Sequence, residues 1–241
     1  MPSLEKKCAL ITGGGGGLGS AICQELARGG ASVVVADRDE AKAKAVAEGI
    51  QSAGGKAAAL KVDIAKEQEV SAAVQGALRA FGRLDILVND AAIDFTVPID
   101  ELTVEEWDAV IRVNLRAPFL FSQLAARIMK AEGGGQIVNI ASTAAKRTWP
   151  NASAYHASKW GLLGLSHALH AELRPFRIKV SAVVAGGMRT PFLLDRFPDI
   201  DPDVLQDPAN VATTVRFLLT LPDETVIPEV TVIPMRESSW P

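Results

Sequence analysis

The stretch Thr12-Gly13-Gly14-Gly15-Gly16-Gly17-Leu18-Gly19 contains five consecutive glycines between two segments of different periodicity. Residues 8–12 form a short apolar run, and residues 18–28 carry Leu18, Ile22 and Leu26 on one helical face. A turn from a strand into a helix needs residues that tolerate positive φ when its backbone approaches a pyrophosphate closely. The position of the glycines therefore favours a nucleotide-binding turn over a flexible loop.

The rest of the chain continues this alternation of apolar runs and helical segments. The predicted strands are 8–12, 32–36, 57–62, 84–88, 136–140, 178–184 and 229–233, and the predicted helices are 18–28, 40–53, 68–81, 104–130, 152–173 and 208–219. Alternation of this kind predicts an α/β fold with a single-domain, Rossmann-like, doubly wound sheet of seven mostly parallel strands and helices on both faces. We expect one domain over 1–241, in which 1–130 mainly binds the cofactor and 131–241 forms the catalytic and substrate half with a C-terminal tail.

Composition excludes several classes of protein. The net charge of −3 and pI of about 5.7 provide no basic field for a nucleic acid. Two cysteines and three histidines argue against a disulfide scaffold and against a transition-metal site. No apolar run reaches the ~18 residues of a membrane span, and residues 1–7 lack the apolar region of a secretory signal. We therefore expect a cytoplasmic protein that binds neither metal, membrane nor nucleic acid.

The glycine spacing identifies a family. Gly13, Gly17 and Gly19 depart from the G-x-G-x-x-G fingerprint and follow the pattern T-G-x-x-x-G-x-G instead. In this respect the chain resembles the short-chain dehydrogenase/reductase family, and the resemblance covers about residues 5–233. It implies a nicotinamide dinucleotide cofactor held at Gly13, Gly16, Gly17, Leu18 and Gly19.

Two residues after the second apolar run bear on the choice of cofactor. Asp37 ends the predicted strand, where a carboxylate accepts hydrogen bonds from both ribose hydroxyls and repels a 2′-phosphate. Arg38 opposes this, since a guanidinium binds phosphate well. Relatives that prefer NADP often carry a basic residue at the position of Gly16. We expect NAD(H) as cofactor, with NADP(H) as the alternative, and Asp39 as the N-cap of the next helix.

Later segments match the family's other cofactor contacts. Asp63 and Ile64 lie where relatives contact the adenine region, although Asp63 could instead cap the helix that begins near Lys66. The family's Asn-Asn-Ala-Gly motif is Asn89-Asp90-Ala91-Ala92 here, so that Asn89 and Ala91 match and Asp90 and Ala92 depart. In the stretch 185–190, Gly186 and Thr190 match a loop that clasps the nicotinamide, and Ala185 replaces the usual proline.

The catalytic prediction rests on four residues in a fixed order. Tyr155, the only tyrosine, and Lys159 lie one helical turn apart. Together with Asn114 and Ser142 they match the family's Asn-Ser-Tyr-Lys set. Because a free tyrosine has a pKa near ~10, we expect Lys159 and the oxidised nicotinamide to favour the phenolate. Tyr155 would then be the general acid in reduction and the base in oxidation, Ser142 would hydrogen-bond the substrate oxygen, Lys159 would also hold the cofactor's ribose, and Asn114 would hold a water that relays protons.

The sequence gives less information about the substrate pocket than about the cofactor and catalytic residues. We expect Asp94, Trp149, Met188 and Phe192 to line it, and the segment 191–197 to act as a lid or to pack on the sheet edge. Residues 235–241 depart from the family pattern, and we expect this tail to pack on a neighbouring subunit of a homotetramer or homodimer.

The expected function is an NAD(H)-dependent oxidoreductase that interconverts a secondary alcohol and a ketone. The alternatives are an NADPH-dependent reductase of the 3-oxoacyl-carrier-protein type and a non-enzymatic dinucleotide-binding regulator. Proteins of the last class typically lose the tyrosine or the lysine, and both are present here.

Overall fold

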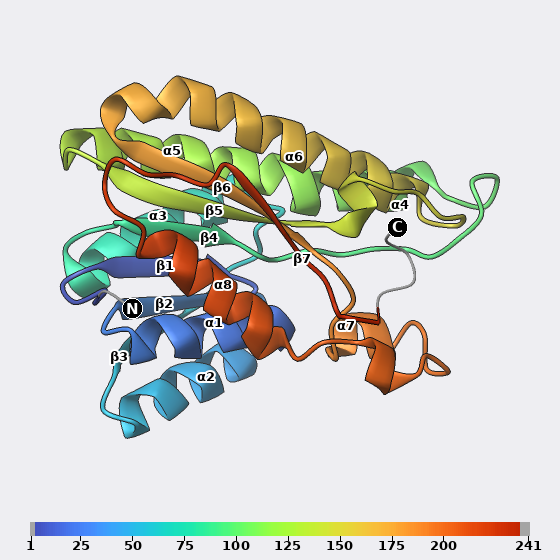
Figure 1. The fold of residues 1–241 in the computed structure, drawn as a ribbon, viewed down its shortest axis with the longest axis horizontal. Helices are drawn as coiled ribbons and strands as arrows, with labels where there is room; N and C mark the ends of the chain where they lie inside the picture. Colours follow the sequence, from blue (N-terminus) through green and yellow to red (C-terminus); the bar gives the residue numbers. More distant parts are fainter. Residues whose placement is uncertain (1–2, 237–241) are drawn as a thin grey trace.

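Seven strands pair side by side in the order β3-β2-β1-β4-β5-β6-β7 in the computed structural model, which describes residues 3–236 (Figure 1). They are β1 (Cys8–Thr12), β2 (Ser32–Asp37), β3 (Lys56–Lys61), β4 (Ile86–Asn89), β5 (Gly135–Ser142), β6 (Ile178–Ala185) and β7 (Glu229–Val232). Every pair is parallel, so the predicted doubly wound sheet is confirmed and is wholly parallel. The strand order reverses between β1 and β4, and in such sheets the ligand crevice lies at the carboxyl ends of these strands.

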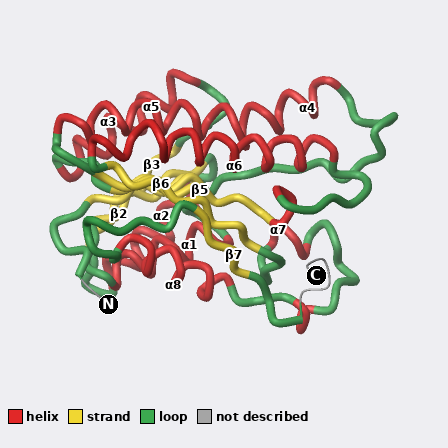
Figure 2. The backbone as a smooth tube through the Cα atoms, turned by 45° about the horizontal axis from the view of Figure 1, so that its top comes forward, coloured by secondary structure: helices red, strands yellow, loops and turns green. Residues whose placement is uncertain are grey.

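Helices cover both faces of the sheet (Figure 2). One face carries α1 (Gly17–Arg28), α2 (Glu40–Ser52) and α8 (Pro208–Leu219), and the other carries α3 (Glu67–Phe81), α4 (Val104–Ile111), α5 (Ala117–Ala131) and α6 (Ser153–Leu173). A short helix, α7 (Pro191–Leu194), lies in the segment predicted as a lid. Among the described residues, none of the helices combines the length and the apolar character that crossing a membrane requires.

The central strands bury both of their faces, whereas β3 and β7 at the two edges of the sheet are partly exposed. On β1, Ala9 and Ile11 pack with the layer of α1, α2 and α8, whereas Cys8 and Leu10 pack with α3 and α5. Because successive side chains point to opposite faces, such a strand must be largely apolar, and residues 8–11 meet that requirement. The buried hydroxyl of Thr12 accepts hydrogen bonds from the amides of Asp90 and Ala91. The core therefore consists of two apolar layers separated by the sheet.

The predicted helical stretch 104–130 is confirmed, although it is not one regular α-helix. A π-helical segment, Arg112–Arg116, separates α4 from α5. Asn114 lies in this segment and is fully buried. Its side chain accepts a 2.8 Å hydrogen bond from the amide of Ile93, and donates to the carbonyl of Ile93 at 2.8 Å and to Ser158 Oγ at 3.1 Å. Short π-helical segments occur frequently at functional sites, and this one places a polar side chain between two helices and a loop.

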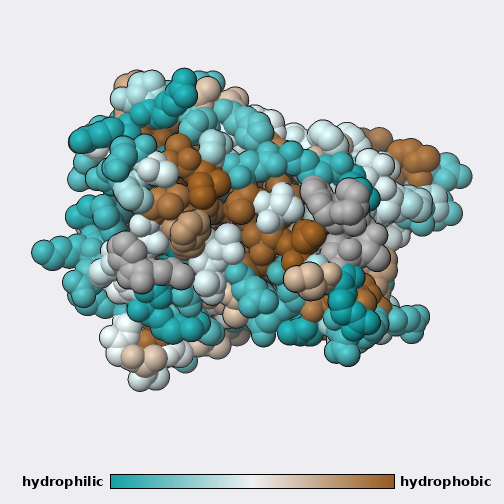
Figure 3. Space-filling view, viewed as in Figure 1, coloured by the Kyte–Doolittle hydropathy of each residue, from teal (hydrophilic) through white to brown (hydrophobic). Residues whose placement is uncertain are grey.

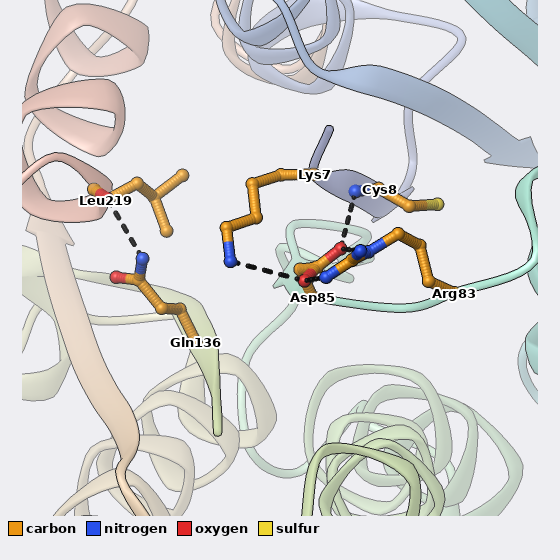
Figure 4. A network of polar contacts seen from close by, with 6 residues as sticks. All are labelled: Lys7, Cys8, Arg83, Asp85, Gln136 and Leu219. Atoms are coloured by element: carbon orange, nitrogen blue, oxygen red, sulfur yellow. Dashed lines mark hydrogen bonds and ion pairs between the residues drawn. The ribbon is translucent and has the colours of Figure 1, made fainter. Parts of the chain in front are cut away.

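A polar network joins the amino ends of the central strands (Figure 4). The carboxylate of Asp85 accepts hydrogen bonds from the backbone N–H of Cys8 at 2.8 Å and from two nitrogens of Arg83, each at 2.6 Å, and Lys7 Nζ lies 3.4 Å away. Nearby, Gln136 donates to the carbonyl of Leu219 at 2.9 Å. Asp85 belongs to this network, and β4 begins only at Ile86, two residues later than predicted. These contacts fix the end of the sheet that lies opposite the candidate site.

Apolar side chains also reach the surface. Figure 3 shows them gathered across the middle of the face seen in Figure 1, over β7 and the segment that leads into it. β7 is the outermost strand beside β6, and its four residues are only partly buried or exposed. A surface of this kind is a common place for proteins to associate.

Candidate active site

A cavity of about 820 Å³ opens at the carboxyl edge of the sheet. Its volume lies within the range that small-molecule and cofactor sites occupy. Most of the predicted site residues line it, although they come from segments far apart in the sequence: Gly13, Gly16, Gly17, Leu18, Asp37, Arg38, Asp63, Ile64, Ala91, Asp94, Ser142, Trp149, Tyr155, Lys159, Gly186, Met188, Thr190 and Phe192.

Three predicted residues, Gly19, Asn89 and Asn114, do not line the cavity but lie behind its wall. Asn89 is buried at the end of β4 and donates a 2.8 Å hydrogen bond to Asn139 Oδ1 on β5. Asn139 in turn donates to Ser166 Oγ on α6 at 2.9 Å. This chain of amides fixes β4, β5 and α6 together beneath the site.

The glycine turn between β1 and α1 has the geometry that a close backbone approach requires. Gly13 and Gly17 have φ values of +70° and +48°, which side-chain-bearing residues rarely adopt. A β-carbon on Gly19 would lie 2.1 Å from the carbonyl oxygen of Gly13. The N-cap residue Gly16 has no side chain to cap α1, and the amide of Gly19 donates to the Asp90 carboxylate. The N-terminus of α1 at Gly16, Gly17 and Leu18 faces the cavity, where a helix N-terminus favours an anion. The turn therefore fits the diphosphate of a dinucleotide.

Asp37 lies at the edge of the cavity and is held by backbone donors. Its Oδ2 accepts a 2.9 Å hydrogen bond from the amide of Gly15, and its Oδ1 accepts one of 2.9 Å from the amide of Asp39. Asp39 caps α2 as predicted, accepting from Ala41 and Lys42. Because Asp37 is fixed, its negative charge stays at the end of β2, where Arg38 also lines the cavity.

Asp63 is not the N-cap of the following helix, so that alternative is wrong. The N-cap position of α3 is Lys66, which makes no side-chain cap bond. Asp63 Oδ1 instead accepts from the amide of Ala65 at 3.1 Å, and the Asp63 amide donates to Glu69 Oε2 at 2.7 Å. Asp63 also lies two residues beyond the end of β3 rather than closing it. The turn presents both Asp63 and Ile64 to the cavity.

Asp90 was not among the predicted site residues, yet it lines the cavity. The amides of Asp90 and Ala91 donate to Thr12 Oγ1 at 3.1 and 3.3 Å, which fixes the loop to β1. Burial raises the pKa of the Asp90 carboxyl to about 7, although the charge of Lys159 and a hydrogen bond from the Gly19 amide oppose the shift. The departure from asparagine at this position was visible in the sequence and was the signal that could have identified it.

Ser142, Tyr155 and Lys159 converge where β5 ends against α6. The Tyr155 ring lies against the cavity, and its hydroxyl is hydrogen-bonded by Ser142. Lys159 is buried, its Nζ lies 5.6 Å from the centre of the Tyr155 ring, and it donates a 2.8 Å hydrogen bond to the carbonyl of Ile140. These contacts place a hydroxyl pair and an amine in one pocket.

Burial shifts the pKa values of both Tyr155 and Lys159. Burial raises the pKa of Tyr155 to about 12, and the hydrogen bond from Ser142 opposes that shift without cancelling it. Burial also lowers the pKa of Lys159 to about 8, although Asp90 opposes the shift. The protein groups alone therefore favour the neutral phenol, and the expected effect of Lys159 together with the oxidised nicotinamide stays a prediction.

The loop after β6 closes onto the glycine turn. A β-carbon on Gly17 would lie 3.4 Å from the side chain of Thr190, which is buried. The amide of Gly186 donates to the carbonyl of Val232 at 2.9 Å, which anchors the start of the loop to β7. Thr190 and Gly186 thereby flank one side of the cavity opposite the end of β4.

Aromatic side chains surround the far part of the cavity. Phe192 lies with its ring centre 6.0 Å from that of Tyr155. The amide of Trp149 donates to His156 Nε2 at 3.1 Å, and the two rings meet edge to face at 4.4 Å. His156 Nδ1 lies 2.9 Å from the carbonyl of Ala144. His156 therefore holds the loop that carries Trp149 beside Tyr155, the residue predicted to be catalytic.

Arg196 is a further cavity residue that the sequence did not single out. Its guanidinium carbon lies 3.8 Å from the centre of the Phe192 ring, and its NH1 lies 3.7 Å from Asp94 Oδ2. The segment 191–197 has no periodicity that reveals which of its side chains point inward. Of the tail 235–241, residues 237–241 lie outside the described part, and Arg236 NH2 lies 4.0 Å from Asp201 Oδ2.

Comparisons with known proteins agree with this geometry. The sequence profile of the family described as short chain dehydrogenase matches residues 7–201. The chain is 38% identical to a cyclohexanol dehydrogenase of Acinetobacter sp. (strain SE19), over 89% of this chain and 88% of that protein.

Two solved structures have nearly the same fold. A metagenomic short-chain oxidoreductase in complex with NADP is 36% identical, with a TM-score of 0.86 over 96% of this chain and 98% of that one. A 3-ketoacyl-(acyl-carrier-protein) reductase from Brucella melitensis complexed with NADH is also 36% identical, with a TM-score of 0.89 over 97% and 99% of the two chains. With the family profile, the relative and the sheet order in agreement, the chain belongs to the short-chain dehydrogenase/reductase family of oxidoreductases.

Proposed function

We propose that this chain is an NAD(H)-dependent oxidoreductase that interconverts a secondary alcohol and a ketone, with Tyr155 as the general acid and base. The observation that carries the proposal is a single cavity with Ser142, Tyr155 and Lys159 at one end and the glycine turn with Asp37 at the other. A dinucleotide is long enough to connect a turn that suits phosphate with a site that suits proton transfer. The cyclohexanol dehydrogenase relative supports a secondary alcohol as the substrate class.

The residues present fit the cofactor. The backbone of the turn at Gly13, Gly16, Gly17 and Leu18 would hold the diphosphate, Gly19 would let α1 pack closely behind it, and Asp37 would accept hydrogen bonds from the adenosine ribose. Gly186 and Thr190 would hold the carboxamide of the nicotinamide. Asp63, Ile64, Asn89 and Ala91 would shape the wall between these ends. When bound, a nicotinamide dinucleotide supplies or accepts the hydride.

Proton transfer is carried out by the protein side chains. In reduction, the Tyr155 hydroxyl donates its proton to the substrate oxygen, and in oxidation the same oxygen accepts it. Ser142 holds the substrate oxygen through a hydrogen bond and stabilises charge that develops there. The ammonium of Lys159 stabilises the phenolate and would bind the nicotinamide ribose. Asn114, buried behind the wall, is proposed to hold a water that carries protons onward.

The preference for NAD rests on the charge at the end of β2. Asp37 is held in place by two backbone amides and would repel a 2′-phosphate, whereas Arg38 beside it would attract one. One of the two similar structures was obtained with NADP and the other with NADH, so membership of the family leaves the choice to such local residues.

The alternative is a reductase of the 3-oxoacyl-carrier-protein type that uses NADPH. It is favoured by the similarity to the Brucella melitensis reductase, which was nevertheless obtained with NADH. Asp37 and Gly16 oppose NADPH as the cofactor. A purely regulatory dinucleotide-binding role is less well supported, because Tyr155 and Lys159 are both present at the cavity.

A panel of secondary alcohols, ketones and a 3-oxoacyl thioester, each with NAD(H) and NADP(H), tests the proposal through the absorbance of the reduced cofactor. We expect turnover of alicyclic alcohols with NAD. Turnover of the thioester alone with NADPH would establish the alternative. No turnover of any substrate with either cofactor would contradict both.

Assembly and location stay predictions. Exposed aromatic side chains on three helices, Trp107 on α4, Phe119 on α5 and Trp160 on α6, support association through this layer. A mass measurement in solution tests for the proposed homotetramer or homodimer. The cytoplasm remains the expected location on the basis of cysteine content.

A further inference from the structure

Asp94 is a buried carboxylate with few partners. It lies on the loop after β4, lines the cavity, and has a side chain only 7% exposed. Thr96 Oγ1 donates to its Oδ2 at 3.5 Å, Arg196 NH1 lies 3.7 Å from the same oxygen, and the carboxylate also accepts from the backbone amide of Phe95. Within residues 3–236, Oδ1 has no partner at hydrogen-bond distance. Buried carboxylates normally accept several short hydrogen bonds, because burial without them is costly.

Arg196 is likewise short of acceptors at the same place. Its side chain is 22% exposed, and its guanidinium carbon lies 3.8 Å from the centre of the Phe192 ring, which in turn lies beside Tyr155. The 3.7 Å between its NH1 and Asp94 Oδ2 is too long for a hydrogen bond, although both groups are charged. Among the described residues, Arg196 therefore keeps N–H donors without an acceptor, and the Asp94 carboxylate keeps lone pairs without a donor.

A neutral group that both donates and accepts a hydrogen bond suits both partners. An ammonium would be repelled by Arg196, and a second carboxylate would be repelled by Asp94. A hydroxyl group donates its hydrogen to a carboxylate and accepts a hydrogen bond from a guanidinium through the same oxygen. The rotation of the carboxylate about its last torsion is only weakly restricted, so Asp94 can present either oxygen to such a group.

The surroundings place this group away from the reacting oxygen. Ser142 hydrogen-bonds the Tyr155 hydroxyl, and Phe192 contacts both the Tyr155 ring and the Arg196 guanidinium. The walls between these polar groups are apolar and include Trp149 and Phe197. A ligand that touches both polar ends therefore needs an apolar frame with two oxygens.

We propose that Asp94 and Arg196 bind a second hydroxyl group of the substrate, so that the preferred substrates are alicyclic diols and the hydroxyketones derived from them. The proposal rests on the proposed function, since it names the substrate class for the same site. Asp94 and Arg196 act as specificity residues, and the hydride and proton steps are unchanged.

The experiment compares cyclohexanol with cyclohexane-1,2-diol and cyclohexane-1,4-diol in the full-length wild type and in three variants. Asp94→Ala removes the carboxylate, and Asp94→Asn keeps its shape without the charge. Asp195→Ala is the matched control, since Asp195 lies on the same segment as Arg196 but is exposed and does not line the cavity. Thermal melting and NADH titration establish that each variant is folded and binds cofactor.

We expect the wild type to favour at least one diol over cyclohexanol in kcat/KM. Asp94→Ala should lower kcat/KM for that diol by about 10- to 100-fold, the range for a lost hydrogen bond to a charged group. The value for cyclohexanol should fall by a clearly smaller factor, and the ratio of the two values is the readout, because the charge of Asp94 also acts on the pKa of Tyr155. The kcat/KM of Asp94→Asn for the diol should lie between those of the wild type and Asp94→Ala. If Asp94→Ala does not fold, Asp94→Asn alone tests the proposal.

Two outcomes overturn the inference and are distinct from each other. If cyclohexanol is turned over and no diol is preferred, the second-hydroxyl site is wrong and the proposed function stands. The same holds if Asp94→Asn lowers kcat/KM for cyclohexanol and for the diol by the same factor. If none of the three alcohols is oxidised with NAD or NADP, the proposed function fails and this inference fails with it.

Discussion

A β-carbon on Gly19 would lie 2.1 Å from the carbonyl oxygen of Gly13, far inside any allowed contact. Gly13 directly follows β1 and Gly19 lies in the first turn of α1, so their close approach lets α1 pack tightly against the end of β1. Because the obstructing atom belongs to the backbone, no side-chain rotation can relieve the clash.

We expect Gly19→Ala to destabilise the fold by about 3 kcal/mol or more, since the helix must move away from the turn. Gly16→Ala is the matched control, because Gly16 has extended φ and ψ values of −152° and 167° and a β-carbon there meets nothing within 4 Å. It should change stability by less than about 0.5 kcal/mol. Urea denaturation of both variants measures the difference, and equal losses would contradict the packing argument.

Asp90→Asn should stabilise the protein at alkaline pH. Burial raises the pKa of Asp90 from 3.8 to about 7, so the folded state binds a proton that the unfolded state has released. This contribution is fully present below pH 4 and is lost as the pH rises through about 7. An asparagine can still accept the hydrogen bond from the Gly19 amide and carries no charge. We expect a gain of roughly 2 kcal/mol at pH 8 and little at pH 4.

Melting temperatures of the wild type and Asp90→Asn at pH 4 and pH 8 test this. The exposed substitution Asp195→Asn serves as the control for a general loss of negative charge. A stabilisation of the same size at both pH values would show that Asp90 does not titrate in this range.

Tyr155→Phe should lower turnover by about 100- to 10,000-fold, because the hydroxyl that exchanges the proton is removed while the ring remains. The ring still packs beside Phe192, so the cavity should keep its shape. NADH binding, followed by fluorescence, should change little. Turnover close to the wild-type value would exclude Tyr155 as the general acid and base.

Asp37→Asn should shift the cofactor preference toward NADP by about 10-fold or more, because the negative charge is lost and an oxygen acceptor for the Gly15 amide remains. Glu40→Gln is the control, since it removes a charge three residues away that is paired with Lys44 and does not line the cavity. The ratio of kcat/KM for NAD and NADP provides the measurement. An unchanged ratio in Asp37→Asn would mean that Arg38 or another group governs the choice.

The sequence predicted the sheet well because each of its signals is local. Apolar runs such as 32–36 mark strands buried on both faces, and the glycine turn marks where the first helix begins. The catalytic and cofactor candidates follow the ends of strands, and parallel strands bring those ends to one edge. This is why residues as distant as Gly13 and Tyr155 line one cavity.

The remaining features depend on contacts that no local pattern contains. Arg196 belongs to a segment without periodicity, and only the packing of its guanidinium on Phe192 places it in the cavity. The pKa values of Tyr155 and Lys159 depend on burial, which residue types alone do not give. The break in the helix 104–130 was also hidden, since the residues 112–116 are ordinary helix formers apart from Asn114 and Val113.

The π-helical segment has a consequence for how this protein tolerates changes in length. A π-helical turn holds one residue more than an α-helical turn, so it resets the angular phase between α4 and α5 by about 100°. Deleting one residue in 112–116 would restore a continuous α-helix and rotate every side chain of α4 by that angle relative to α5. The helix would survive, but the buried Asn114 would turn away from Ile93 and Ser158. The segment therefore sets the rotation of α4 relative to α5. A single-residue deletion in it is a more severe change than any substitution on the exposed faces of the two helices.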